Sequence, residues 1–210
     1  MRVYLVRHGE SEANIGGYIN DDPSKPVTLT AKGRAQATTA AEALRAVAIT
    51  HAYASRFPRA RETAEIILAG RELSLTIDAR LNERRSGLDG QSVEAFNSLV
   101  CADPVRIKPE NGESFLEQMA RLRAFLDEIA QRHPQGVVLA VSHENPILAV
   151  AALAGREAEV AARGAIGNCE WLLLEWPSES LLTPQVAYLE DEHHSGEGQR
   201  DAVGEDDRPA

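Results

Sequence analysis

The stretch that decides the fold is VYLVRHGE, residues 3–10, an apolar run that ends in an arginine–histidine pair. The same construction returns once, where the run VVLAV at 137–141 leads into Ser142 and His143. Short apolar runs of this kind are typical of buried strands in a parallel sheet. Because open α/β sheets bind ligands beyond the carboxyl ends of their strands, the pattern predicts that His8 and His143 share one binding edge.

The segments between these two runs alternate between helical and strand patterns. Thr30 precedes apolar residues at helical spacing, Ser114 with Glu117 is typical of a helix N-terminus, and Pro146 fits the first turn of another helix. The alternation predicts a three-layer α/β/α sandwich with a mostly parallel central sheet and helices on both faces. We expect further strands near 51–54, 73–77, 171–176 and 186–189, and polar loops over 9–27 and 79–90.

Charge and composition limit the possible partners. The chain has 210 residues, 43% of them apolar, and a net charge of -10. From Glu190 onward eight acidic residues face two arginines, so we expect a catalytic domain over 1–189 and an acidic, disordered tail over 190–210. No basic stripe favours nucleic acid, and no run is long enough for a membrane span. The widely spaced Cys101 and Cys169 indicate a reduced, cytoplasmic protein.

Phosphoryl transfer is the chemistry that these residues can perform. The neutral imidazole of His8 can attack phosphorus without a separate base. Arg7 and Arg59, each at a predicted strand end, can hold the non-bridging oxygens. Glu83 can protonate a leaving alkoxide, and His143 can donate to the phosphoryl group as charge develops. This set requires neither a metal nor a cofactor.

The ordered motifs resemble those of the histidine phosphatase superfamily, the phosphoglycerate mutase-like proteins. The resemblance spans residues 2 to about 176. It implies that His8 is phosphorylated and that water later releases phosphate, with Arg59 and Glu83 as phosphate ligand and acid. It adds Asn14 as a phosphate contact. Ser142, next to His143, is a further candidate for hydrogen bonding to the substrate. The motifs are RHGE at 7–10, SEAN at 11–14, Leu29-Thr30 with Gly33, SRFPRARETA at 55–64, LNE at 81–83 followed by Gly87 and Gly90, GES at 112–114 and VSH at 141–143.

The sequence departs from this family at two places. Glu144 follows the second histidine, where the family usually has glycine, so its carboxylate must point away from the phosphate, pair with an arginine, or select an unusual substrate. The longer, more aromatic loop of the cofactor-dependent mutases is absent between Asn14 and Leu29. The second departure favours a phosphatase over a mutase.

The sequence therefore predicts a metal-independent phosphomonoesterase that acts through phosphohistidine on a small phosphate ester. Two alternatives remain open. One is a phosphoglycerate mutase-type transferase, and the other is a non-catalytic phospholigand-binding protein on the same fold. Arg84 and Arg85, beside Glu83, could reach a distal anionic group of the substrate, although a role outside the site is favoured.

Overall fold

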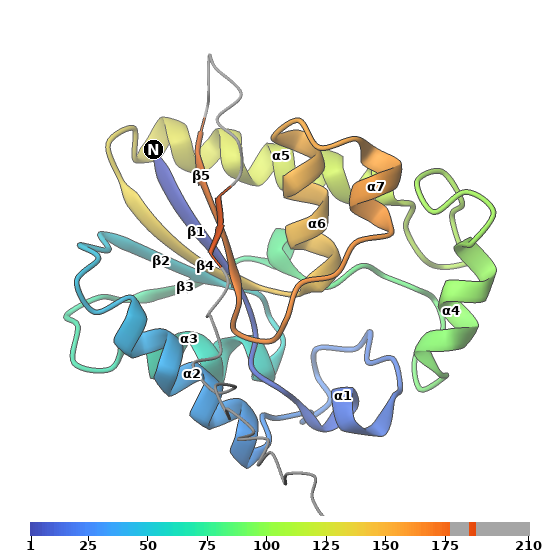
Figure 1. Cartoon of the computed structure of the whole chain (residues 1–210), viewed down its shortest axis with the longest axis horizontal. Helices are drawn as coiled ribbons and strands as arrows, with labels where there is room; N and C mark the ends of the chain where they lie inside the picture. The colour runs from blue at the N-terminus through green and yellow to red at the C-terminus, as the bar shows by residue number, and fades with distance from the viewer. Residues whose placement is uncertain (177–184, 188–210) are drawn as a thin grey trace, which may run out of the picture.

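A six-stranded sheet forms the centre of the computed structural model, which describes residues 1–176 and 185–187 (Figure 1). The strand order is β3-β2-β4-β1-β5-β6. The first four strands in this order run parallel, whereas at one edge β5 pairs antiparallel with β1, and β6 pairs antiparallel with β5. The strands are β1 (Arg2–Arg7), β2 (His51–Ala54), β3 (Leu75–Ile77), β4 (Val137–Ser142), β5 (Trp171–Glu175) and β6 (Gln185–Ala187).

Helices cover both faces of the sheet, as Figure 1 shows. One face carries α2 (Ala31–Ala43) and α3 (Pro58–Leu68). The other carries α5 (Phe115–Arg132), α6 (Glu144–Leu153) and α7 (Ala158–Ala162). The predicted three-layer α/β/α sandwich with a mostly parallel sheet is confirmed.

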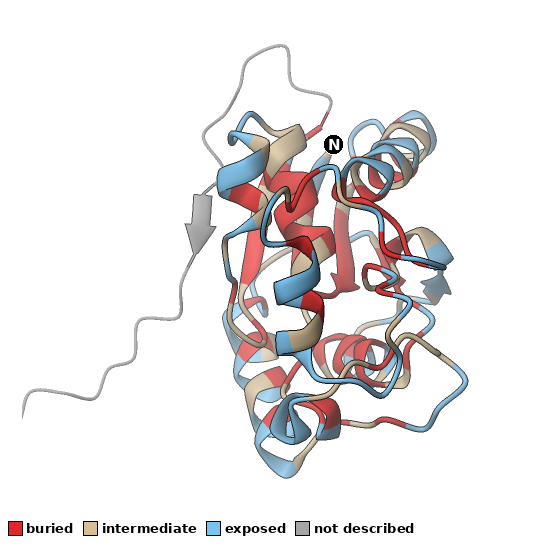
Figure 2. Cartoon of the chain, turned by 90° about the vertical axis from the view of Figure 1, so that its right-hand side faces the viewer, coloured by how far each residue is buried: buried red, intermediate tan, exposed pale blue. Residues whose placement is uncertain are grey.

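Two separate cores result from the alternation of side chains along each strand. In β1, Val3 and Leu5 pack against α5 and α6, whereas Val6 packs against α2 and α3. All three are at most 1% exposed. Figure 2 shows buried residues along the strands and on parts of the helices. The central strands are therefore buried on both faces, as the continuous apolar runs predicted.

The expected helix starts are present. Thr30 accepts a hydrogen bond from the Gly33 amide at the start of α2. Ser114 accepts one from the amide of Glu117, whose carboxylate returns a bond to the Ser114 amide. These reciprocal bonds satisfy amides that would otherwise lack partners at the helix end.

Short helices interrupt the two segments that were expected to be loops. Residues 9–27 contain α1 (Glu12–Gly16), and residues 79–90 begin with the 3-10 helix η1 (Ala79–Leu81). The helix α4 (Val93–Val100) follows the second of these segments. A five-residue helix is too short to show a 3.6-residue period, so periodicity could not find α1. Figure 1 shows α1 and α4 beyond the sheet, on the same side.

Neighbouring β1 and β4 bring the two sequence motifs together. Their register pairs Arg7 with Ser142, so His8 and His143 leave the sheet side by side. The chain passes from β1 to β2 on one side and from β4 to β5 on the other. Such a divergence opens a crevice at the carboxyl ends of the two strands.

The end of the chain is only partly described. The strand expected near 186–189 is represented by β6, whereas the proposed tail over 190–210 lies outside the described residues. Within the described residues, no helix combines the length and apolar character that crossing a bilayer requires.

Candidate active site

The two predicted histidines meet at the ends of β1 and β4. Their ring centroids are 5.0 Å apart, and the His8 amide donates to the Ser142 carbonyl at 3.0 Å. Both side chains are buried, His143 completely. The parallel pairing of two strands thus sets the distance between two imidazoles that lie 135 positions apart in the chain.

One ring nitrogen of His8 is held by its own backbone. Nδ1 lies 2.7 Å from the Gly9 carbonyl oxygen, which can only accept, so Nδ1 carries the proton. Nε2 is then an acceptor, and Arg59 Nε donates to it at 3.1 Å. Burial, and then the charge of Arg59, lower the pKa of His8 well below its usual range. His8 is therefore neutral at pH 7, with the Nε2 lone pair facing Arg59.

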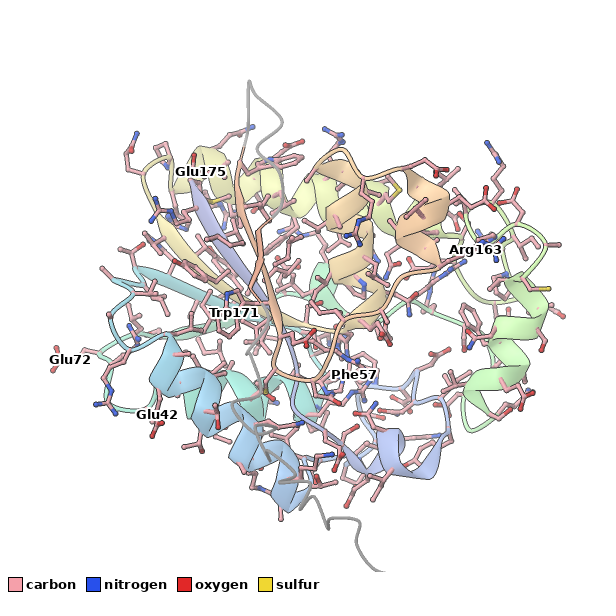
Figure 3. All side chains as sticks on the ribbon, viewed as in Figure 1. Glu42, Phe57, Glu72, Arg163, Trp171 and Glu175 are labelled. Carbon is pink, nitrogen blue, oxygen red and sulfur yellow. The ribbon has the colours of Figure 1, made fainter. Side chains whose placement is uncertain are left out.

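Arg59 is fixed from several directions at the start of α3. Pro58 opens this helix, a position where its missing amide hydrogen is not needed. The Arg59 Nη1 donates to Asn20 Oδ1 at 2.6 Å, and the guanidinium stacks 4.5 Å from the Phe57 ring centroid. Burial lowers the pKa of Arg59 to about 10, so the group remains cationic at neutral pH. Figure 3 labels Phe57 at the end of the sheet where β1 finishes and the chain continues to α1.

His143 is fully buried beside Arg59. Its Nε2 lies 2.8 Å from Ser55 Oγ, and its Nδ1 lies 3.4 Å from Arg59 Nη2. The Phe57 ring contacts its edge, with centroids 4.9 Å apart. Burial and the nearby Arg59 charge lower the pKa of His143 well below its usual range. The ring presents Nδ1 toward Arg59, which can only donate, so Nδ1 is the acceptor in this arrangement.

Glu83 lies on the loop after η1, where a second arginine holds the backbone. Arg121 of α5 donates from Nη2 to the carbonyls of Asn82 at 2.9 Å and Glu83 at 3.2 Å. The buried Glu113 carboxylate pairs with the same guanidinium at 2.7 and 3.0 Å. Burial raises the pKa of Glu83 to about 7, although its carboxylate accepts from the Arg84 amide. Glu83 can therefore hold or release a proton near neutral pH.

Arg7 is already paired on one side of the site. Its Nη2 lies 3.4 Å from Glu144 Oε2, and its Nη1 donates to the Ile166 carbonyl. Of the alternatives raised by Glu144, pairing with an arginine is the one observed.

Asn14 and Ser142 are held in different ways. The Asn14 Oδ1 accepts from the Ser11 amide at 3.0 Å, which leaves its NH₂ group as the donor available to a ligand. The Ser142 hydroxyl instead donates to the Leu81 carbonyl at 2.6 Å. The Ser142 side chain thus ties β4 to the segment that carries Glu83.

A cavity of about 320 Å³ opens over these groups. Arg7, His8, Asn14, Arg59 and Glu83 line it, whereas His143 and Ser142 lie behind its wall. No group of three His, Cys, Asp or Glu side chains is placed to hold a metal ion within residues 1–176 and 185–187.

Arg84 and Arg85 follow Glu83 directly but have different surroundings. Arg84 is buried and donates to the backbone carbonyls of Glu113, Pro104 and Ile107. Arg85 is exposed and does not line the cavity. Arg84 therefore lines the cavity with its guanidinium held by backbone carbonyls, whereas Arg85 lies outside the lining.

Sequence reasoning missed several residues that hold the site together. Asn20 orients Arg59, Thr63 accepts from the Gly9 amide, and Asn168 donates to the His8 carbonyl. Nothing local distinguishes these polar residues from others on loops and helices. Asn20 could be identified only as a partner of the buried Arg59, and this contact is visible only in the folded structure.

Comparisons with known proteins agree with this geometry. The family model described as histidine phosphatase superfamily (branch 1) matches residues 3–185. The adenosylcobalamin/alpha-ribazole phosphatase of Escherichia coli is 33% identical over 168 residues, 76% of this chain and 82% of that protein. A probable phosphoglycerate mutase of Erwinia tasmaniensis is 31% identical over 210 residues, 91% of this chain and 96% of that protein.

A solved structure shares both the fold and part of the sequence. The mycobacterial glucosyl-3-phosphoglycerate phosphatase, in complex with VO3, superposes with a TM-score of 0.73 and is 26% identical. The match covers 83% of this chain and 90% of that one. With the family match over most of its length and the paired histidines at one sheet edge, the chain belongs to the histidine phosphatase superfamily, branch 1.

Proposed function

We propose that this protein is a metal-independent phosphomonoesterase that transfers phosphate from a small ester to His8 and then to water. The orientation of His8 is the observation that carries the proposal. Because Nδ1 donates to the Gly9 carbonyl, the unprotonated Nε2 is the ring atom that can attack phosphorus. Burial keeps the ring neutral, so no separate base is needed.

The arginines would stabilise the phosphoryl group during transfer. Arg59 Nε now donates to the His8 lone pair, and an entering phosphate oxygen would take over that donor. Arg7 would supply further positive charge from the other side. In the structure Nδ1 of His143 faces Arg59 Nη2, which can only donate, so Nδ1 accepts there. Once a phosphate takes over the Arg59 donors, Ser55 can donate to Nε2, and Nδ1 can then carry the proton and donate to the same phosphoryl oxygens. Such donors, fixed before the reaction, stabilise charge as it develops.

Glu83 would act first as an acid and then as a base. With a pKa of about 7, it is half protonated at neutral pH and can give its proton to the leaving alkoxide oxygen. The carboxylate left behind can take a proton from the water that attacks phosphohistidine. Each turnover then breaks the ester P–O bond, forms and breaks one P–N bond, forms a new P–O bond to the water oxygen, and returns Glu83 to its starting state.

The relatives support a small, soluble substrate. Similar proteins are named as an adenosylcobalamin/alpha-ribazole phosphatase, an alpha-ribazole-5'-P phosphatase and a glucosyl-3-phosphoglycerate phosphatase, and the phosphate esters in the last two names are small molecules. The cavity suits a substrate of this class, because Val93, Phe96 and Leu148 add an apolar wall beside the charged groups. A mutase, the activity named for the Erwinia relative, would return phosphate to an alcohol instead of water.

The test is hydrolysis of p-nitrophenyl phosphate and of an alkyl phosphate panel with excess chelator. Wild type should release one phosphate per alcohol, and His8→Ala should release none. His51→Ala, at the amino end of β2, is the matched histidine control and should retain turnover. Loss of activity with chelator, or activity that survives in His8→Ala, would contradict the proposal. Phosphate appearing on an added alcohol acceptor would indicate the mutase instead.

A further inference from the structure

Glu144 is a fixed part of the cavity wall. It begins α6 immediately after His143, and it lines the cavity together with Glu83. Its Oε2 pairs with Arg7 Nη2 at 3.4 Å, and its Oε1 accepts from the Ile166 amide at 3.3 Å. Both oxygens are thus engaged, and the side chain is 31% exposed. These two contacts hold the carboxylate at the cavity wall.

The pairing with Glu144 limits the positive charge available to a substrate. Arg59 is directed at His8, and Arg84 is occupied by backbone carbonyls. Arg7 shares its guanidinium between Glu144 and the Ile166 carbonyl. Among the described residues lining the cavity, no other arginine or lysine is present. A phosphate that takes Arg59 and Arg7 therefore leaves no cation for a second anionic group.

The rest of the wall suits uncharged alcohols. Asn14, Asn97 and Asn145 line the cavity and can donate to or accept from hydroxyl groups. The negative charge of Glu144 also reaches Glu83, where it adds to the rise in pKa caused by burial. Glu83 is the proposed proton donor to the leaving oxygen. The negative charge of Glu144 therefore also acts on the part of the alcohol that is attached to this oxygen.

We propose that Glu144 selects the charge of the alcohol part of the ester, admitting neutral and cationic alcohols and rejecting those that carry a carboxylate near the ester oxygen. This inference rests on the proposed function, because it assumes that phosphate binds at His8. It names a substrate class: phosphate esters of hydroxylated or amino alcohols. A site with this selectivity differs from one that binds phosphate esters of hydroxy acids.

The test is a ladder of two-carbon esters that differ in charge and little in size. O-Phosphoethanolamine, 2-hydroxyethyl phosphate and 2-phosphoglycolate carry an ammonium, a hydroxyl and a carboxylate at the same distance from phosphorus. In wild type, kcat/KM should fall along this series, by about tenfold or more between the neutral and the anionic ester. In Glu144→Gln the neutral-to-anionic ratio should shrink by about tenfold.

Two further variants separate the local charge from general effects. Glu144→Asp keeps the negative charge and should keep the wild-type order of kcat/KM among the three esters. Glu94→Gln removes an exposed carboxylate from the first turn of α4, outside the cavity lining, and should also keep the wild-type ratios. Equal ladders in wild type and Glu144→Gln, or a wild-type preference for 2-phosphoglycolate, would overturn the inference.

Binding measurements make the result independent of turnover. Dissociation constants of the three esters for His8→Ala and for His8→Ala/Glu144→Gln, measured by calorimetry, should show the same ladder and the same flattening. Flat binding in both proteins would overturn the role of Glu144. A ladder in binding without phosphate release by wild type would instead contradict the proposed hydrolysis and leave the selection by Glu144 standing.

Discussion

Among the residues proposed for catalysis, Glu83 is expected to change its charge near neutral pH. Its pKa is raised to about 7, so its acid form predominates below pH 7 and is lost as the pH rises. We expect the rate of His8 phosphorylation by an alkyl phosphate to fall above pH 7, approaching tenfold per pH unit. Rapid-quench measurements of phosphohistidine would record this decline. p-Nitrophenyl phosphate should show a weaker decline, because its phenolate leaves without a proton.

The same assay on Glu83→Gln provides the control. Glutamine cannot donate the proton, so phosphorylation by the alkyl ester should drop by about 10²–10⁴-fold, and the descending limb near pH 7 should disappear. The drop with p-nitrophenyl phosphate should be much smaller. An unchanged descending limb in Glu83→Gln would show that another group titrates there.

Asn20 is predicted to act by positioning Arg59. Its Oδ1 accepts from Arg59 Nη1 at 2.6 Å, and its Nδ2 donates to the Asp22 carbonyl, which fixes the amide. Loss of a hydrogen bond to a charged group costs about 1.5–3 kcal/mol, so Asn20→Ala should weaken inhibition by phosphate about tenfold or more. The inhibition constant of inorganic phosphate would measure this. Asn97→Ala, on the cavity wall, is the control, and equal effects of both would contradict the role of Asn20.

At the scale of residues, the sequence located those that follow strands or ordered motifs. His8, Arg59 and Glu83 line one cavity, as the motif order suggested, although their chemical roles remain predictions. Asn20 was not predicted, because its partner Arg59 lies 39 positions away and the loop that carries Asn20 shows no periodic pattern of apolar residues. Ser142 was placed on the correct strand, but its hydroxyl direction depends on the Leu81 carbonyl, a contact between separate elements.

The junction between β1 and α2 depends on two glycines in contact. A methyl group on Gly33 would lie 2.0 Å from the Glu10 carbonyl oxygen, and one on Gly9 would lie 2.4 Å from the Gly33 carbonyl oxygen. Gly33→Ala usually favours a helix, but here the overlap is with backbone, which cannot rotate away. We expect the free energy of unfolding to fall by about 1–3 kcal/mol in Gly33→Ala.

Urea denaturation would measure this loss. Glu42→Ala lies on the same helix, with its side chain exposed, and should leave the free energy of unfolding nearly unchanged (Figure 3). A stability of Gly33→Ala equal to or above that of wild type would contradict the close approach of the loop after β1 to α2.

Elements with strong periodicity or capping signals were predictable, and short ones were not. The caps at Thr30 and Ser114 are local, so they could be identified without the fold. In contrast, α1 is held beside α4 by backbone pairing of Tyr18 with Ser92 and by the Ile19 amide donating to the Gln91 carbonyl. Contacts between distant segments decide these elements, and no window of sequence contains both partners.

At the scale of the whole molecule, strand order assembles the site. His8 and His143 end neighbouring strands, and Arg59 begins the helix after β2, on the other side of β4. The sequence predicted a mostly parallel sheet, but the strand order depends on how the connections cross. The central position of β1 and β4 required the structure, and it explains why the cavity opens at the carboxyl ends of these two strands.

The separation of charge along the chain leads to the last prediction. Residues 190–210 carry a large share of the net charge of -10, whereas among the described residues those that line the cavity lie between 7 and 164. Truncation after Leu189 should therefore leave kcat/KM for a neutral alkyl ester within about twofold at 0.15 M salt, where charges beyond about 8 Å are screened. Assays of the full and truncated chains at 0.15 M and at low salt would test this. A large loss of activity at both salt concentrations would show that the removed segment contributes directly to the site or to its folding.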